Sequence, residues 1–181
     1  MRNLTIKAEI LNNLCKNLCE IRSKQGISTD ILAEVLGKSS RSIVYACKGA
    51  TLLSMTDIYR ISCVCRISIE SLLLTTLSEN EIEAAARNIH KEYLNLIQGK
   101  TFYDREKTKE ALLATLRQNL LLHSDTKKDK SVIDGITTHE AYRKAYERTV
   151  NFKSKNISNA VNIYLIAHSY YLTMDEMCQR K

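Results

Sequence analysis

The sequence predicts an all-α protein. The 181 residues include no Pro and only 5 Gly, so the chain has few of the residues that interrupt helices. Apolar residues recur at intervals of three and four, which is the period of an amphipathic helix. Hydrophobic residues make up 44% of the chain and charged residues 26%. The chain can therefore bury a core, and the disordered, collagen-like and disulfide-scaffold classes are excluded.

The first two helices are expected before residue 37. Residues 5–24 carry one apolar stripe, and Gly26 ends this helix, because a helix C-terminus often needs a residue with positive φ. Ser28 can cap a short second helix through its side-chain oxygen. The residues expected to face the core are Leu11, Leu14, Leu18, Ile21, Ile31, Leu32, Val35 and Leu36.

A tight turn at Gly37 is expected to lead into the third helix. Ser39 or Ser40 caps this helix, which covers Arg41 to Lys48 and ends at Gly49. The side chains expected to be buried are Ile43 and Ala46.

Three further helix starts are marked by capping residues. Ser54 and Asp57 form a capping-box pattern, Ser68 begins a fifth helix, and a second capping box at residues 78–81 opens a connector helix that runs to Gly99. The inward-facing residues expected here are Ile58, Ile61, Val64, Ile69, Leu72 and Leu73, then Ile82, Ala85, Ala86, Ile89, Tyr93 and Leu96 of the connector.

Residues 10–75 carry a set of spaced anchor residues within GISTDILAEVLGKSSRSIVYACKGA and the following SMTDIYRISCVCRISIESLL. This stretch resembles the lambda repressor-like (XRE-type) helix-turn-helix family. The matching features are Arg22, Gly26, Leu32-Ala33, Leu36-Gly37, Ile43, Gly49 and Ser68-Ile69-Glu70-Ser71-Leu72. The resemblance implies a five-helix DNA-binding domain over residues 1–76.

Two positions depart from the family pattern. The family usually places Glu where Cys47 stands, and that Glu often pairs with the Arg that matches Arg22. Its usual Gln at the start of the second helix is Thr29 here. We expect the fold to tolerate both changes, while Arg22 needs another partner or must reach solvent.

In a helix-turn-helix, the second helix of the motif enters the major groove, and its N-terminal residues contact base edges. The corresponding residues here are Ser39, Ser40 and Arg41, with Val44 and Tyr45 one turn later. Arg41 can donate two hydrogen bonds to guanine, Ser40 can bond a base or a phosphate, and Val44 can touch a thymine methyl group. Tyr45 can reach a phosphate or stack weakly.

Phosphate contacts are expected from Lys38, Lys48 and the helix N-terminus near Thr29. Considered alone, Arg41 is best interpreted as an ordinary exposed cation. If the segment is a helix-turn-helix, a DNA contact by Arg41 is favoured, because no acidic residue occurs between positions 35 and 56.

The second half of the chain contains a candidate repeat. Leu14-Cys-Lys-Asn-Leu18 aligns with Leu116-Arg-Gln-Asn-Leu120 at an offset of 102, and two further segments align at an offset of 105. These are Ile58-Tyr-Arg-Ile-Ser62 with Ile163-Tyr-Leu-Ile-Ala167, and Ser68-Ile-Glu-Ser-Leu72 with Thr173-Met-Asp-Glu-Met177. A degenerate second copy of the five-helix unit explains this order, and chance likeness between amphipathic helices is the alternative.

The expected organisation is a DNA-binding domain at 1–76, a connector helix at 77–100 and a helical domain at 101–181.

The middle of the second copy is poorly preserved. A shortened helix is expected at Lys130 to Ile136, and a capping box at residues 137–140 opens another helix, Glu140 to Arg148. The basic and aromatic side chains of that helix could contact nucleic acid, but packing or self-association is favoured. They are Tyr142, Arg143, Lys144, Tyr146 and Arg148.

Charge and cysteine content suit a reduced compartment and an anionic partner. The 27 Lys and Arg against 20 Asp and Glu give a net charge of +7 and a pI near 9.1. The N-terminus lacks an apolar signal segment and no apolar run could span a membrane, so we expect a cytoplasmic protein with no membrane partner. The six cysteines are expected to be buried thiols, and no cofactor or metal site is expected, because neither Cys nor His has zinc-ligand spacing.

No catalytic pattern occurs in the sequence, which favours a non-enzyme. Three hypotheses remain. The first is a sequence-specific transcriptional regulator of double-stranded DNA, expected to be a repressor and a homodimer, in the prophage, mobile-element or bacterial setting that the resemblance implies. The second is a protein-interaction module or inhibitor that keeps the scaffold without reading DNA. The third is a regulator gated by a protein, peptide or small-molecule effector bound to the second half.

Overall fold

The computed structural model describes residues 2–124, 160–169 and 172–179, and helices are the only regular secondary structure within these ranges. The prediction of an all-α protein is confirmed. The chain divides into two compact units, Met1–Glu106 and Lys107–Lys181. None of the described helices combines the length and the apolar character needed to cross a bilayer. The expected helices Lys130–Ile136 and Glu140–Arg148, and Gly135, lie outside the described residues.

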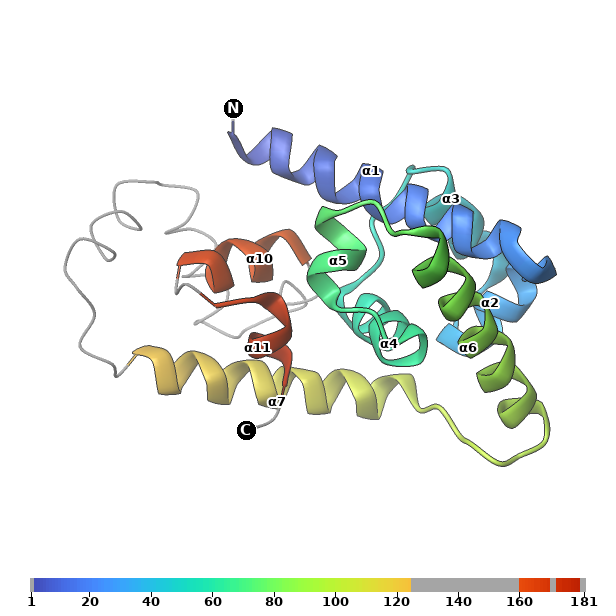
Figure 1. The fold of residues 1–181 in the computed structure, drawn as a ribbon. Coiled ribbons are helices and arrows are strands. Elements are labelled where there is room, and N and C mark those ends of the chain that lie inside the picture. Colours follow the sequence, from blue (N-terminus) through green and yellow to red (C-terminus); the bar gives the residue numbers. More distant parts are fainter. Residues whose placement is uncertain (1, 125–159, 170–171, 180–181) are drawn as a thin grey trace. The chain divides into compact units, whose positions relative to one another are not determined.

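The helices of the first unit lie close to their expected positions (Figure 1). A single 3₁₀ turn, Lys24–Gly26, follows the first helix. The α-helices are α1 (Arg2–Ser23), α2 (Thr29–Leu36), α3 (Ser40–Cys47), α4 (Met55–Cys65), α5 (Ile69–Leu74) and α6 (Glu79–Ile97).

Serine side chains begin each helix from α2 to α6. In each case the hydroxyl accepts a hydrogen bond from a backbone N–H in the first turn, which satisfies a donor that has no partner within the helix. The capping residues are Ser28, Ser39, Ser54, Ser68 and Ser78. The two expected capping boxes, at Ser54–Asp57 and Ser78–Glu81, are both present. For α3 the cap is Ser39, so Ser40 is the first helical residue.

The core of the first unit is formed by the inward faces of all six helices. Helix α6 packs against α1, α2 and α4 (Figure 1). We expected a docked connector helix between two domains here, whereas α6 belongs to the first unit. Ile10 takes the core position expected of Leu11. The residues expected to face the core that are only half-buried are Leu11, Ile31, Val64, Tyr93 and Leu96. The largest fully buried side chains are Ile10, Leu14, Leu18, Ile21, Leu32, Leu36, Ile43, Met55, Ile58, Ile61, Ile69 and Leu72.

A buried asparagine joins α1 to the end of α5. Asn17 has no exposed surface, and its Nδ2 donates to the backbone oxygens of Leu72 and Thr75, each at 2.9 Å. Its Oδ1 accepts from the backbone N–H of Leu77 at 3.1 Å. One side chain therefore satisfies three backbone groups where α5 ends and the chain turns toward α6.

The second unit contains a similar contact between an asparagine and the end of a short helix. Its described helices are α7 (Arg105–Ser124, whose first two residues belong to the first unit), α10 (Ala160–Ser169) and α11 (Met174–Cys178). Asn119 on α7 is buried, and its Nδ2 donates to the backbone oxygens of Met177 and Gln179 at 2.9 and 3.0 Å. Thr173 begins α11 with a capping box, as Ser68 caps α5. Asn119 aligns with Asn17 at the offset of 102, and Met177 aligns with Leu72 at the offset of 105.

Replacing Asn17 with Ala should destabilise the first unit strongly. The change leaves three backbone groups without their partner, two of them in buried contacts, so we expect a loss of about 2–4 kcal/mol in the free energy of unfolding. Urea denaturation followed by circular dichroism measures this loss. Asn12→Ala, at an exposed position of the same helix, should change the free energy little. Equal stability of the two variants would show that the Asn17 amide does not hold α1 against α5.

Candidate nucleic-acid interface

Helix α3 has one buried and one exposed face. Ile43, Ala46 and Cys47 are buried against the first unit. Arg41 and Tyr45 are exposed on the other side. A spacing of four residues places two side chains on the same helix face, one above the other. The outward face therefore presents Arg41 and Tyr45, two of the residues expected to face DNA.

Arg41 and Tyr45 form a pair on this face. Nε and Nη2 of Arg41 donate to the Tyr45 hydroxyl at 3.2 and 3.0 Å. The guanidinium carbon lies 5.4 Å from the centre of the Tyr45 ring, within the range of a cation–π contact. Tyr45 nevertheless keeps 39% of its surface exposed. The pair restricts the guanidinium while leaving N–H groups available, because a guanidinium carries five.

The two serines at the start of α3 are engaged within the protein. Ser39 Oγ accepts from the Ser42 backbone N–H at 3.3 Å, and its role is to cap the helix. Ser40 Oγ donates to Oδ1 of Asp30, in the first turn of α2. Asp30 is exposed, so a carboxylate stands next to the N-terminal end of α3. The absence of acidic residues between positions 35 and 56 therefore does not make this surface free of negative charge.

Lys38, expected to contact phosphate, binds a buried carboxylate. Its Nζ lies 3.0 Å from Oδ2 of Asp57, and the Lys38 side chain is only 19% exposed. The ion pair connects the α2–α3 turn to the N-terminus of α4. The structure therefore places Lys38 in a structural ion pair and not on an open surface.

Asp57 gathers four hydrogen bonds around a side chain with no exposed surface. Its Oδ2 accepts from Lys38 and from the backbone N–H and hydroxyl of Ser54, at 3.0, 3.1 and 2.6 Å. Its Oδ1 accepts from Nε of Arg105 at 3.1 Å. Burial acts to raise the pKa of Asp57, but the hydrogen bonds from Ser54, Lys38 and Arg105 outweigh it and hold the pKa below its ordinary value.

The segment after α6 packs against the α2–α3 turn. Gly37 has a φ of +58°, and a Cβ there would stand 3.4 Å from the Tyr103 ring. The guanidinium of Arg60 lies 4.2 Å from the centre of the same ring. Glycine is favoured at this turn because it tolerates the left-handed backbone. Together with Arg105, Tyr103 fixes the turn that leads into α3.

Thr29 and Cys47, where the sequence departs from the pattern that it resembles, both take part in contacts with α1. Nη1 of Arg22 donates to Thr29 Oγ1 at 3.2 Å, so the hydroxyl replaces a carboxylate as partner. Cys15 and Cys19 of α1 both donate to the backbone oxygen of Cys47, at 2.7 and 3.0 Å. These contacts attach the C-terminal end of α3 to α1.

Burial and the neighbouring Cys19 thiol raise the pKa of Cys47 to about 11. At neutral pH Cys47 is therefore an uncharged thiol that packs as a small apolar group. None of the six cysteines forms a disulfide. The expectation that they are buried holds for Cys47, Cys65 and Cys178, whereas Cys15 and Cys19 are half-buried and Cys63 is exposed.

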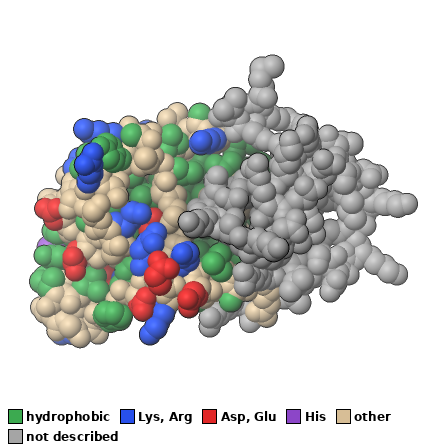
Figure 2. Space-filling model, turned by 180° about the vertical axis from the view of Figure 1, so that it is seen from behind, with side chains coloured by type: hydrophobic (Ala, Val, Ile, Leu, Met, Phe, Trp, Pro, Cys, Tyr) green, Lys and Arg blue, Asp and Glu red, His purple; other side chains and the backbone are tan. Residues whose placement is uncertain are grey.

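On the face that Figure 2 draws, the basic side chains of the described residues lie in groups apart from one another. Figure 2 shows Lys and Arg side chains in separate groups on the face opposite to that of Figure 1, several of them beside acidic side chains. Around α3, the exposed cations are Arg41 and Lys48, the latter at the C-cap of the helix. Thr29 is half-buried at the N-terminus of α2 and Val44 is half-buried on α3.

Sequence reasoning missed three residues that shape this interface: Asp30, Asp57 as an ion-pair partner, and Arg105. Asp57 was recognised as a capping residue, which explains its bond to Ser54. Its contacts with Lys38 and Arg105 cross 19 and 48 residues, respectively. Local spacing carries no signal for such contacts.

Comparison of the chain with protein-family models, with curated protein sequences and with solved structures found no match.

Replacing Asp57 with Asn should lower the free energy of unfolding at neutral pH. It should also make the free energy of unfolding less sensitive to acid. Because the folded-state pKa lies below the ordinary value, the stabilisation from this carboxylate is complete above about pH 5 and is lost as the pH falls through the folded-state pKa. At neutral pH we expect the variant to lose about 2–4 kcal/mol, since Lys38 and Arg105 lose a charged partner but remain partly exposed.

Urea denaturation at several values between pH 3 and pH 7, about the range where carboxyl groups titrate, measures both effects. Glu34→Gln, which removes an exposed carboxylate from α2, is the matched control and should follow the wild type. A stability of Asp57→Asn that equals the wild type at neutral pH would contradict the assigned role.

Proposed function

We propose that this protein is a sequence-specific DNA-binding transcriptional regulator that places α3 in the major groove. The single observation that carries the proposal is the outward face of α3. It presents the paired Arg41 and Tyr45 at helical spacing, while its opposite face is buried. A helix held by its inner face, with a restricted arginine on its outer face, has the form required to read base edges.

Arg41 is assigned the main role in sequence discrimination. Two parallel hydrogen bonds to guanine discriminate against a wrong base by about 1–3 kcal/mol. The Tyr45 hydroxyl holds the guanidinium before DNA arrives, which reduces the entropy lost on binding. Val44 lies on the same helix, one turn after Ser40, and can contact a thymine methyl group.

Phosphate contacts are assigned to Lys48, to the hydroxyl of Thr29 and to the N-terminus of α2. Thr29 accepts from Arg22 and can still donate its own proton. Lys38 is withdrawn from this group because its ammonium is bound to Asp57. It supports binding indirectly by fixing the turn before α3.

We also propose that the second unit is a degenerate copy of the first. The support is the equivalent role of Asn17 and Asn119, which both bond the C-terminal carbonyl groups of a short capped helix. A duplicated chain can carry one reading unit and one unit for dimerisation or effector binding. The resemblance to the lambda repressor-like family favours a repressor that binds DNA as a homodimer.

A protein-interaction module is the second candidate, and two observations favour it. Asp30 places a negative charge beside Ser40, and Asp57 neutralises Lys38. Both reduce the positive potential that DNA binding requires. The experiments below separate the two functions.

The first experiment measures binding to the promoter region of the protein's own gene and to a random duplex. Fluorescence anisotropy at low and moderate salt should show tighter binding to the promoter and a steep loss of affinity with salt. Arg41→Ala with Tyr45→Ala should weaken promoter binding about tenfold to a hundredfold. Arg87→Ala, on the exposed side of α6, is the control for loss of one surface cation.

A double variant that binds as well as the wild type would refute the reading role of α3. Weak binding that is equal for both duplexes and independent of the substitutions would leave a charge-driven association and favour the interaction module.

Asp30→Asn tests the same surface through an expected increase in DNA affinity. Removing a carboxylate near the N-terminus of α3 lowers repulsion of the phosphates, so affinity for every duplex should rise, by about twofold to fivefold at low salt. The same anisotropy assay measures it. Glu70→Gln, at a half-buried position on α5, should leave the affinity unchanged, and a similar rise in both variants would show a net-charge effect with no contribution from the α3 surface.

A further inference from the structure

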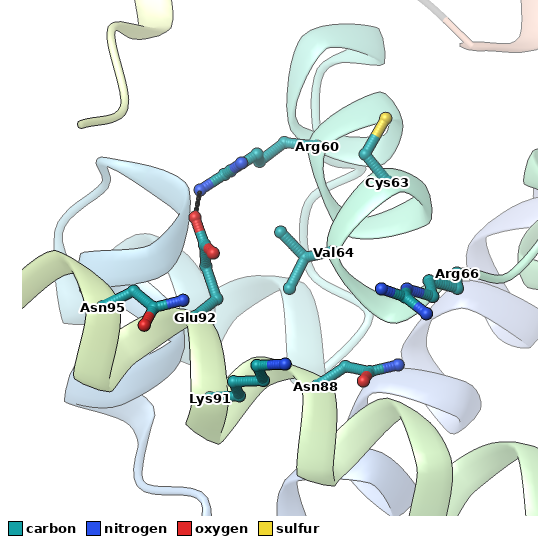
Figure 3. A pocket seen from close by; sticks show the side chains of 8 residues that line it. All are labelled: Arg60, Cys63, Val64, Arg66, Asn88, Lys91, Glu92 and Asn95. Carbon is teal, nitrogen blue, oxygen red and sulfur yellow. Dashed lines mark hydrogen bonds and ion pairs between the residues drawn. The ribbon is translucent and has the colours of Figure 1, made fainter. Parts of the chain in front are cut away.

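A cavity between α4 and α6 is lined mainly by polar and basic side chains, none of them from α3. Its volume is about 320 Å³, at the lower end of the range for small-molecule sites. Figure 3 shows its walls, with one set of side chains from α4 and its C-terminal cap and the other from α6. The polar lining residues are Arg60, Arg66, Asn88, Lys91, Glu92 and Asn95.

The charge of the cavity is unbalanced. Arg60 and Glu92 face each other across it with Nη2 and Oε1 2.6 Å apart, so these two charges compensate (Figure 3). Arg60 is fixed further by the backbone oxygen of Val35 at 3.3 Å. Arg66 and Lys91 are both exposed, and neither forms an ion pair within the part of the chain that the structure describes. Two uncompensated cations on opposite walls match a ligand with two negative charges.

The backbone of Arg66 supports a role for its side chain. Arg66 ends α4 with a φ of +59°, a conformation that glycine adopts without strain. Among the described residues it is the one non-glycine with positive φ, whereas the other such positions are Gly26, Gly37, Gly49 and Gly99. Arg66 therefore combines a backbone conformation that favours glycine with a side chain in the wall of the cavity, and such a position is a candidate for a functional side chain.

The amide side chains indicate a ligand with a polar body. Asn88 Nδ2 donates to the backbone oxygen of Cys65 at 3.2 Å, which orients the side chain and leaves Oδ1 as an acceptor. Asn95 adds a second amide on the same helix. Val64 is the one aliphatic residue of the lining, so an apolar ligand would gain little here.

We propose that this cavity binds a small phosphate monoester, such as a sugar phosphate or a nucleoside monophosphate. The phosphate lies between Arg66 and Lys91, because a phosphate monoester carries a charge of about −1.5 to −2 at neutral pH. In Figure 3 Asn88 lies between Arg66 and Lys91 and Asn95 lies beyond Lys91, so the polar body extends along α6 toward Asn95. A free phosphate ion would leave most of the cavity unfilled. The proposal is independent of DNA binding and places the ligand in the first unit.

Isothermal titration calorimetry of the full chain with ribose 5-phosphate and AMP tests this assignment, with ribose and adenosine as uncharged counterparts. We expect the two phosphorylated compounds to bind at millimolar concentration or better and the uncharged compounds not to bind. The Arg66→Gly/Lys91→Ala variant should lose at least about tenfold in affinity. Arg87→Ala, on α6 but outside the cavity lining, should bind as the wild type does.

Arg66→Gly alone gives a readout that a merely structural role would not produce. Glycine relieves the strained backbone, so the midpoint of thermal unfolding without ligand should rise or stay constant while affinity for AMP falls. Unchanged affinity of this variant would overturn the assignment of Arg66. Failure of both phosphorylated compounds to bind, or equal binding of adenosine and AMP, would overturn the proposal. Loss of DNA affinity in the double variant, without nucleotide binding, would reassign the two cations to DNA phosphates.

Discussion

The contact on which the candidate interface depends is the buried carboxylate of Asp57. It connects the α2–α3 turn through Lys38, the start of α4 through Ser54, and the start of α7 through Arg105. A buried charge is stable only when its partners compensate for the lost hydration. The four hydrogen bonds therefore require the three segments to stay together, and this requirement sets the position from which α3 projects.

In both units a buried asparagine makes hydrogen bonds that orient the helices of the core. In each unit a buried asparagine on a long helix, Asn17 or Asn119, satisfies carbonyl groups at the end of a short capped helix. Apolar packing alone would allow the long helix to slide along its axis, whereas directed hydrogen bonds define one register.

Most of the first unit could be predicted because its signals are local. Serine caps, glycine ends and apolar periodicity act within one or two helical turns, so they predicted the starts of α2 to α6 and the ends of α3 and α6 to within about two residues, the usual uncertainty of helix ends. The exposed pair Arg41–Tyr45 also follows from a local spacing of four. The partners of Lys38 and Ser40 could not be predicted, because Asp57 and Asp30 reach them only through the tertiary fold. The same holds for α6, whose period predicted a buried face but not its place inside the first unit.

Selection of binding sites from a pool of randomised duplexes, carried out with the wild type and with Arg41→Ala, tests the central claim that α3 reads DNA. The account predicts an enriched motif for the wild type. For the variant it predicts the same motif with the preference for guanine lost at one position, because one side chain contacts one base pair. An identical motif for both proteins, or no enriched motif for the wild type, would contradict it.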